Sequence, residues 1–193
     1  MMEKGYKKMF WGFLITIFDI NLGHINILPD FIGYYIMGSG IYILYSEFKN
    51  DNFKRANTLA NVLMSYSLIM GVAEYAISAN IIGSGLYEHP AYTIVNFILS
   101  IVISSAILIM TFNIISGIID LYLHREMEDE AIILINKQKN YTILTVTGLL
   151  LIAVSLNISN EYFITASAIF LIAVNLYFAA ILRGILHDSE GAA

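Results

Sequence analysis

The chain has no cysteine and little charge. Among its 193 residues only two are prolines, only 13% are charged, and 58% are apolar. Without cysteine, the sequence excludes disulfide bonds, thiolate nucleophiles and cysteine-ligated metal centres. So few charges among so many apolar residues also exclude an ordinary soluble composition.

The sequence signatures of common enzyme classes are absent as well. There is no His-Glu-x-x-His zinc motif, no Gly-x-Ser-x-Gly elbow, no P-loop and no dinucleotide fingerprint. The four histidines are far apart in the chain and give no metal-ligand spacing. We therefore assign no catalytic residue, no metal ligand and no cofactor, and we expect no nucleic-acid partner.

Long apolar blocks dominate what is present. A helix that crosses a membrane needs about 20 mostly apolar residues, and polar links or Gly and Pro turns separate blocks that approach this length. The sequence predicts six transmembrane helices in an antiparallel bundle, an all-α polytopic membrane protein with a single integral domain. The expected spans are residues 9–28, 30–46, 56–82, 91–123, 141–156 and 162–182.

The basic residues fix the expected orientation. Six spans place all ten of them at one membrane face: Lys4, Lys7, Lys8, Lys49, Lys54, Arg55, Arg125, Lys137, Lys139 and Arg183. Because cytoplasmic loops carry the excess of Lys and Arg, both termini are predicted to be cytoplasmic. The only arginines lie at this face, so an anionic headgroup would have to be bound there.

The link at residues 124–140 has two interpretations. The apolar segment 131–135 lies between an acidic run, 126–130, and two lysines. It is either an interfacial helix lying along the inner leaflet or part of a helical hairpin that extends spans four and five into the cytoplasm.

Two carboxylates fall deep inside predicted spans. Asp19 is about 15 Å along the first helix from Met9, and Glu74 is similarly deep in the third span. A charged carboxylate at a helix centre costs roughly 2.5–3.5 kcal/mol, so such groups usually face the bundle interior. Burial favours the protonated form, which a proton-coupled or cation-binding site exploits.

Other polar residues extend this candidate site. We predict ligand or ion binding by Asp19, Asn21, His24, Glu74, Asn96, Asn113 and Asp120. The alternative for the serine and asparagine stripes is packing, because such side chains hydrogen-bond between helices. The alternative for residues 21–26 is that the first helix ends early and they form a loop. In the second span, Gly33, Met37 and Gly40 share one face, which predicts close contact with a neighbouring helix.

One sequence segment carries a resemblance. Phe10-Trp-Gly12, then Asp19, then the run at 27–34, Ile-Leu-Pro-Asp-Phe-Ile-Gly-Tyr, resemble the opening of small uncharacterised membrane proteins of Firmicute-type bacteria. The resemblance covers the first two spans and implies the bacterial cytoplasmic (inner) membrane, without implying a function.

Three functions remain open at this point. The first is a small transporter or ligand-binding membrane protein for a small molecule or ion, in which the buried carboxylates bind protons or cations, acting alone or as a homodimer. The second is a non-catalytic membrane subunit, regulator or immunity-type protein that docks a cytoplasmic or membrane protein partner through the acidic run 126–130 and the apolar segment 132–135. The third is an intramembrane enzyme acting on lipid, with Asp19 and His24, or Asp120 and His124, as its acid–base pair.

Overall fold

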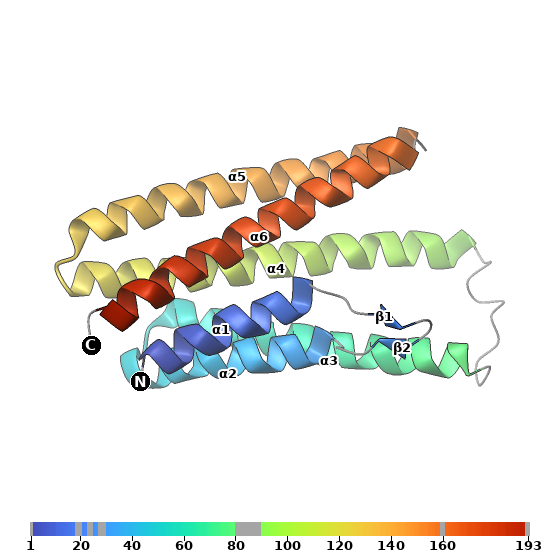
Figure 1. Ribbon diagram of the computed structural model, residues 1–193. Helices are drawn as coiled ribbons and strands as arrows, with labels where there is room; N and C mark the ends of the chain where they lie inside the picture. The colour runs from blue at the N-terminus through green and yellow to red at the C-terminus, as the bar shows by residue number, and fades with distance from the viewer. Residues whose placement is uncertain are drawn as a thin grey trace.

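Long helices make up nearly all of the chain (Figure 1). The structure is a computed structural model that describes residues 2–17, 21–22, 25–26, 30–79, 90–158 and 161–191. Within these ranges the helices are α1 (Met2–Ile17), α2 (Asp30–Phe48), α3 (Asp51–Ser78), α4 (Pro90–His124), α5 (Glu128–Ile158) and α6 (Glu161–Gly191). A pair of two-residue strands, β1 (Asn21–Leu22) and β2 (Ile25–Asn26), lies between α1 and α2. The predicted all-α class is confirmed.

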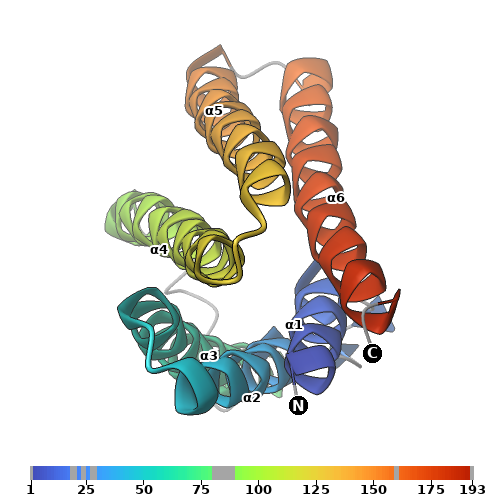
Figure 2. The same ribbon diagram turned by 90° about the vertical axis from the view of Figure 1, so that its left-hand side faces the viewer.

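The helices pack in chain order and the last packs on the first. Each helix contacts the next, and α6 returns to α1, so the six form a closed ring when viewed end-on (Figure 2). Both termini lie at one end of this ring, together with the α2–α3 turn and the α4–α5 turn (Figure 1). Because the ten basic residues lie at or near these same segments, we call this end the basic end.

Among the described residues, three helices are long and apolar enough to cross a membrane. The qualifying segments are Asp51–Ala73 in α3, Phe97–His124 in α4 and Glu161–Ser189 in α6. Many of their apolar side chains point outward, for example Ile69 at 67% exposed and Ile169 at 61%. Large contiguous apolar surfaces of this kind are rare on soluble proteins and are the surfaces that lipid covers.

The predicted first span is too long. α1 ends at Ile17, whereas the apolar pattern predicted helix over 9–28, and β1 and β2 occupy part of that range. Asn21 pairs with Asn26 in antiparallel register. Asparagine and glycine are weak helix formers, so their concentration here outweighs the apolar residues between them. The early-ending alternative is the one that the structure has.

The link between α4 and α5 is a tight helical hairpin. α4 ends at His124, and Glu126 adopts a left-handed backbone conformation with φ of 60°. The Met127 amide donates to the Tyr122 carbonyl at 3.0 Å, which closes the end of α4. α5 then runs unbroken from Glu128, so segment 131–135 is its first part and not a separate interfacial helix.

Glycines let α1 and α2 approach backbone to backbone. A Cβ atom added at Gly33 would lie 2.8 Å from the Gly12 carbonyl oxygen, and one added at Gly40 would lie 2.6 Å from the Gly5 carbonyl oxygen. Only a residue without a side chain fits so close to a neighbouring backbone. The predicted contact face of Gly33, Met37 and Gly40 is therefore confirmed, with α1 as the neighbour.

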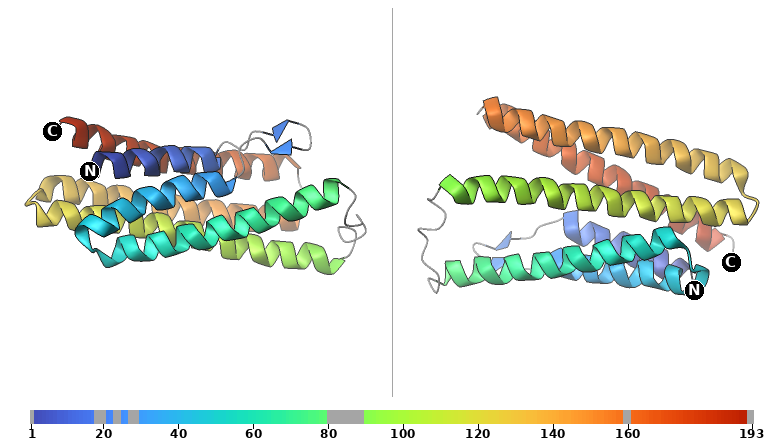
Figure 3. Two further views of the ribbon diagram at one scale, coloured as in Figure 1. Left: turned by 90° about the horizontal axis from the view of Figure 1, so that it is seen from below. Right: turned by 180° about the vertical axis from the view of Figure 1, so that it is seen from behind.

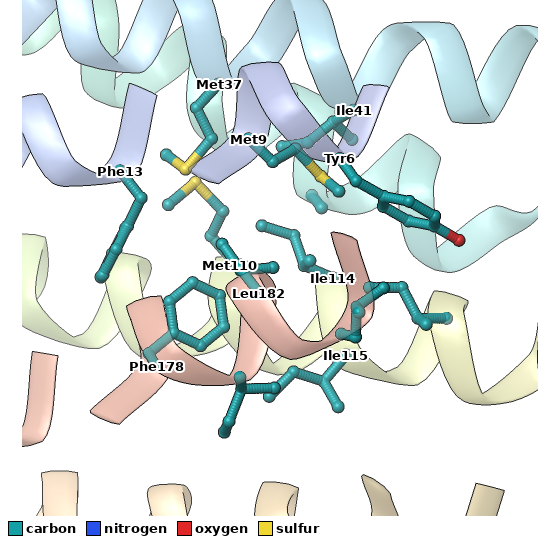
Figure 4. Packing of buried hydrophobic residues seen from close by; sticks show 14 of the residues in the cluster. Tyr6, Met9, Phe13, Met37, Ile41, Met110, Ile114, Ile115, Phe178 and Leu182 are labelled. Carbon is teal, nitrogen blue, oxygen red and sulfur yellow. The ribbon is translucent and has the colours of Figure 1, made fainter. Parts of the chain in front are cut away.

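The buried core lies toward the basic end and includes side chains of all six helices. Figure 4 shows the part of it where α1, α2, α4 and α6 meet. Phe13 of α1 packs edge-on against Phe178 of α6, with ring centroids 4.6 Å apart. Met37 of α2 and Met110 of α4 are fully buried beside them. This core closes the centre of the ring at that level, since interdigitated side chains leave few voids.

Candidate functional site

Non-helical backbone begins partway along the bundle. From the contact between Phe13 and Phe178, the stretch of α6 back to Glu161 rises about 26 Å, whereas α1 rises only about 6 Å further before it ends at Ile17. Roughly 20 Å of α6 therefore extends past the end of α1. β1 and β2 lie short of the far ends of α3 and α4 in every view (Figures 1 and 3).

This depth is informative because lipid does not tolerate unpaired backbone groups. Irregular backbone at membrane depth occurs where protein buries it or where it lines a water-filled cavity. β1 and β2 pair with each other through only two residue pairs. Backbone that leaves the helix at this level must therefore be buried by protein or be in contact with water.

The predicted site residues are only partly described. Asp19 and His24 lie outside the described residues. Asn21 is in β1, Glu74 in α3 and Asn96 in α4, and for these three the structure describes the backbone but not the side chain. The prediction that they surround one cavity therefore stays a prediction.

Asp120 holds a turn in place. Its Oδ2 accepts hydrogen bonds from the side-chain amides of Asn50 at 2.8 Å and Asn52 at 2.9 Å. Asn50 also caps α3, because its Oδ1 accepts from the backbone amide of Asn52 at 2.8 Å and, more weakly, from that of Phe53 at 3.4 Å. The carboxylate thus ties the α2–α3 turn to α4. Its bonds among the described residues run to asparagines and not to the exposed His124.

Asn113 lies about two turns from Asp120 along α4, in the wall of a groove between α3 and α4. The groove has a volume of about 580 Å³. Asn113 is 8% exposed, and its side-chain amide donates to the Ile109 carbonyl at 2.6 Å. This bond uses one of the two amide hydrogens, so the other and the side-chain carbonyl remain available to a ligand.

The rest of the groove has a charged rim and an apolar wall. Asp51, Lys54 and Arg55 from the first two turns of α3 form the rim. Thr58 follows on the same helix, and its hydroxyl donates to the Lys54 carbonyl at 3.1 Å. The remaining lining residues are apolar: Leu59 and Ile109. We call this feature the α3–α4 groove.

Sequence reasoning missed the residues that make these two features. Asn50 and Asn52 were not singled out, although an asparagine just before a long helix is a recognisable N-cap signal. Lys54 was used only to orient the chain in the membrane, and Arg55 was otherwise considered only as one of the arginines at the face where an anionic headgroup would bind. Their place beside Asn113 depends on the register between α3 and α4, which no pattern within one helix carries.

Polar residues of α4 also bind α5, as the packing alternative expected. The Gln138 amide donates to the Phe112 carbonyl at 3.0 Å and to the Ser116 hydroxyl at 2.7 Å. The Thr111 hydroxyl donates to the Tyr141 hydroxyl at 3.3 Å, and both residues are fully buried. These bonds fix the register of the α4–α5 hairpin.

Tyr6 is a buried residue near the basic end. It is 1% exposed, and its hydroxyl has no hydrogen-bond partner among the described residues. Burial raises the pKa of this hydroxyl far above its ordinary value, and the nearby Tyr122 adds to the effect. The hydroxyl is therefore uncharged at neutral pH.

The described residues offer no ready metal centre, since no three His, Asp or Glu side chains among them gather closely enough to hold an ion. Comparisons of the chain with protein-family models, with curated proteins and with solved structures find no match.

Proposed function

We propose that this is a small six-span membrane protein that binds, and transports, a small polar solute or cation in a vestibule within the half of the bundle away from the basic end. One observation carries this proposal. α1 stops about 20 Å short of the level where α6 begins, and the chain continues there as the short strands β1 and β2. A helix that ends within the membrane leaves backbone groups exposed, and transporter sites commonly use such groups to bind a solute or an ion.

The orientation follows from the basic end. Lys and Arg gather there, and the positive-inside rule then makes both termini cytoplasmic and the vestibule outward-facing. The packed core of α1, α2, α4 and α6 separates the vestibule from the cytoplasm. In keeping with the resemblance of its first two spans, we assign the protein to a bacterial inner membrane.

The deep acids are the proposed protonation or cation sites. Asp19 is the second residue after the end of α1 in the sequence, and Glu74 lies near the end of α3 that is farther from the basic end. Asn21, His24 and Asn96 would supply neutral polar lining. Asp120 is less suited to this role, because one of its oxygens already accepts two amide hydrogen bonds.

Single-cysteine labelling tests the vestibule directly, because the natural chain contains no cysteine to remove. We expect Asn21→Cys and Asn26→Cys to react with a membrane-impermeant cationic thiosulfonate added outside intact cells. Tyr162→Cys, at the exposed start of α6, is the positive control, and His187→Cys should react only after permeabilisation. Strand cysteines that react from neither side would mean that no aqueous vestibule exists.

Ion flux tests the acids. In proteoliposomes that enclose a pH-sensitive dye, imposed Na⁺ or K⁺ gradients should drive proton movement by the wild-type protein. Glu74→Gln and Asp19→Asn should each abolish it, while Asp120→Asn should retain it if the variant folds. Full flux in both deep-acid variants would contradict the assignment.

A second candidate, docking of a partner, is favoured by the first turns of α5. Ile132, Ile133 and Ile135 are 56%, 54% and 45% exposed, whereas Ala131 and Leu134 face inward. These isoleucines follow an acidic first turn at the basic end. A subunit or regulator would dock here, and an Ile132→Ser/Ile133→Ser variant would then lose a stoichiometric partner during purification in mild detergent. Repeated recovery of the wild-type protein alone would exclude this candidate.

A further inference from the structure

The α3–α4 groove has features that the outward vestibule does not explain. It lies at the beginning of an apolar span, since the membrane-crossing segment of α3 starts at Asp51, which is itself part of the rim. It is also on the outside of the bundle, because Lys54, Arg55 and Ile109 are all exposed. The groove therefore opens toward the surrounding bilayer at the level of the basic end.

Two cations of the rim are available to a ligand. Within the described ranges, neither Lys54 nor Arg55 forms an ion pair or a hydrogen bond with its side chain. They are adjacent in sequence on the first two turns of α3. A phosphate group fits this pair, because arginine presents a fork of N–H donors to phosphate oxygens and lysine adds a compact positive charge.

The wall below the rim suits an apolar chain. Leu59 and Ile109 line the groove, and exposed apolar residues such as Val62 and Ile69 continue along α3 away from the basic end. A free phosphorylated solute would gain nothing from this strip. An amphiphile uses both parts, with its phosphate at the rim and its chain on the wall.

Asp51, the acidic residue of the rim, restricts the lipid headgroups that fit the groove. Asp51 offers hydrogen-bond acceptors next to the two cations, and the buried Asn113 offers an amide donor and a carbonyl. A headgroup that carries N–H or O–H donors, such as ethanolamine or glycerol, satisfies Asp51. A choline headgroup has no such donor, and a phosphomonoester would bring excess negative charge toward the carboxylate.

We propose that the α3–α4 groove binds an inner-leaflet phospholipid with its phosphodiester between Lys54 and Arg55, its donor-bearing headgroup on Asp51 and Asn113, and an acyl chain along Leu59 and Ile109. Basic pockets between membrane helices on the cytoplasmic side are known to bind lipid headgroups. This site is independent of the proposed vestibule, because it lies on the outside of the bundle, beside the packed core, and opens to lipid.

Lipid retention tests the proposal. The protein is reconstituted in nanodiscs of equal parts phosphatidylethanolamine, phosphatidylglycerol, phosphatidylcholine and phosphatidic acid, and the lipids that stay bound on release are identified by native mass spectrometry. The wild type should retain one ethanolamine or glycerol phospholipid. Lys54→Gln/Arg55→Gln should reduce that retention at least tenfold, and Asp51→Asn should erase the preference over phosphatidylcholine.

A matched control separates the groove from general surface charge. Lys137→Gln/Lys139→Gln on α5 removes the same charge from the same end of the bundle but lines no part of the groove. Equal retention in the two double variants would overturn the proposal, provided that both elute as single species with unchanged melting temperature. If Lys54→Gln/Arg55→Gln does not fold, Thr58→Trp, which fills the groove without removing charge, should displace the lipid; retention would again overturn the proposal.

The source of the phosphate is tested by competition. Inorganic phosphate or glycerol 3-phosphate at 10 mM, a concentration on the order of those of cellular phosphate esters, should leave the retained phospholipid in place. Displacement would assign the groove to soluble phosphate esters instead. Neither result changes the expected labelling of Asn21→Cys and Asn26→Cys from outside the cell. Failure of the lipid-binding proposal can therefore be distinguished from failure of the vestibule proposal.

Discussion

The α1–α2 and α5–α6 hairpins are both antiparallel helix pairs, yet they are held together in different ways. In α1–α2, glycines face backbone on the opposite helix, as Gly33 does against the Gly12 carbonyl. In α5–α6, Gly148 faces a side chain instead: an added Cβ there would lie 2.9 Å from Leu171 Cγ. The α1–α2 pair is in contact through backbone atoms. The α5–α6 pair is in contact through the Leu171 side chain, which packs against Gly148.

The difference shows which part of the ring can adjust. A backbone contact leaves no rotamer to change, so α1 and α2 form a rigid unit with the buried core. The Leu171 side chain, which packs against Gly148, can change rotamer. We therefore expect α5 and α6 to shift relative to each other at a small cost in free energy. If the protein changes conformation during transport, we expect α5–α6 to move and α1–α2 to stay fixed.

The largest expected effect is from Gly12→Ala. The new methyl group would meet the Met37 backbone and lie 2.7 Å from the Gly33 carbonyl oxygen, so the two helices must separate. We expect destabilisation of about 3 kcal/mol, the upper part of the range for overpacking, measured by unfolding in mixed micelles. Gly184→Ala is the control, because a methyl group added there would have no neighbour within 4 Å among the described residues, and it should be neutral or slightly stabilising.

Next in size is Asp120→Ala, which releases the α2–α3 turn from α4. The variant loses two charge-assisted hydrogen bonds to Asn50 and Asn52. Because the site is partly exposed, we expect a loss of about 2 kcal/mol in unfolding free energy. Asn50→Ala should cost a similar amount, since it also removes the helix cap. Additive effects in the Asp120→Ala/Asn50→Ala double variant would show that the two residues do not act together.

The contact face of the second helix was predictable because its signal lies within one helix. Gly33, Met37 and Gly40 share a face at helical spacing, and small residues on a shared face predict close packing. Asn113 and Asp120 are about two turns apart on one face of the fourth predicted span, so their shared face was visible for the same reason. Both patterns follow from about 100° of rotation per residue, which the sequence determines without reference to any other helix.

The features that the sequence did not reveal depend on the register between helices or on a balance of weak conformational preferences. The partnership of Asp120 with Asn50 joins residues far apart in the chain, and the groove depends on where α3 lies along α4. The early end of α1, at Ile17, was predicted only as an alternative because Leu22 and Ile25 keep the following segment apolar on average. Average apolarity indicates burial in a membrane, but it does not distinguish helix from strand.

A smaller effect is expected from Gly148→Ala, the counterpart of Gly12→Ala in the other hairpin. The obstacle is the end of the Leu171 side chain, which can move to another rotamer. We expect a loss of about 1 kcal/mol in unfolding free energy. The comparison between the hairpins would fail if Gly148→Ala and Gly12→Ala had equal costs in the same mixed-micelle titration.

The smallest effect is expected from removing the unpartnered hydroxyl of Tyr6, and its sign is opposite. Tyr6→Phe removes a buried polar group that has no hydrogen bond among the described residues, so we expect stabilisation of up to about 1 kcal/mol. Tyr141→Phe is the matched variant: it removes a hydroxyl that accepts a bond from Thr111, and it should destabilise by about 0.5 kcal/mol.

The unfolding free energy at alkaline pH gives a second test of the role of Tyr6. Its pKa is raised in the folded protein above the ordinary value of 10.0, mainly by burial, so the folded state keeps a proton that the unfolded state loses. Its contribution to stability is therefore fully present below pH 10.0 and decreases as the pH rises beyond that value. In Tyr6→Phe the unfolding free energy should fall less steeply above this pH than in the wild type. Parallel curves would mean that water or a moving side chain reaches the hydroxyl, and that the core at the basic end is less tightly closed than its burial indicates.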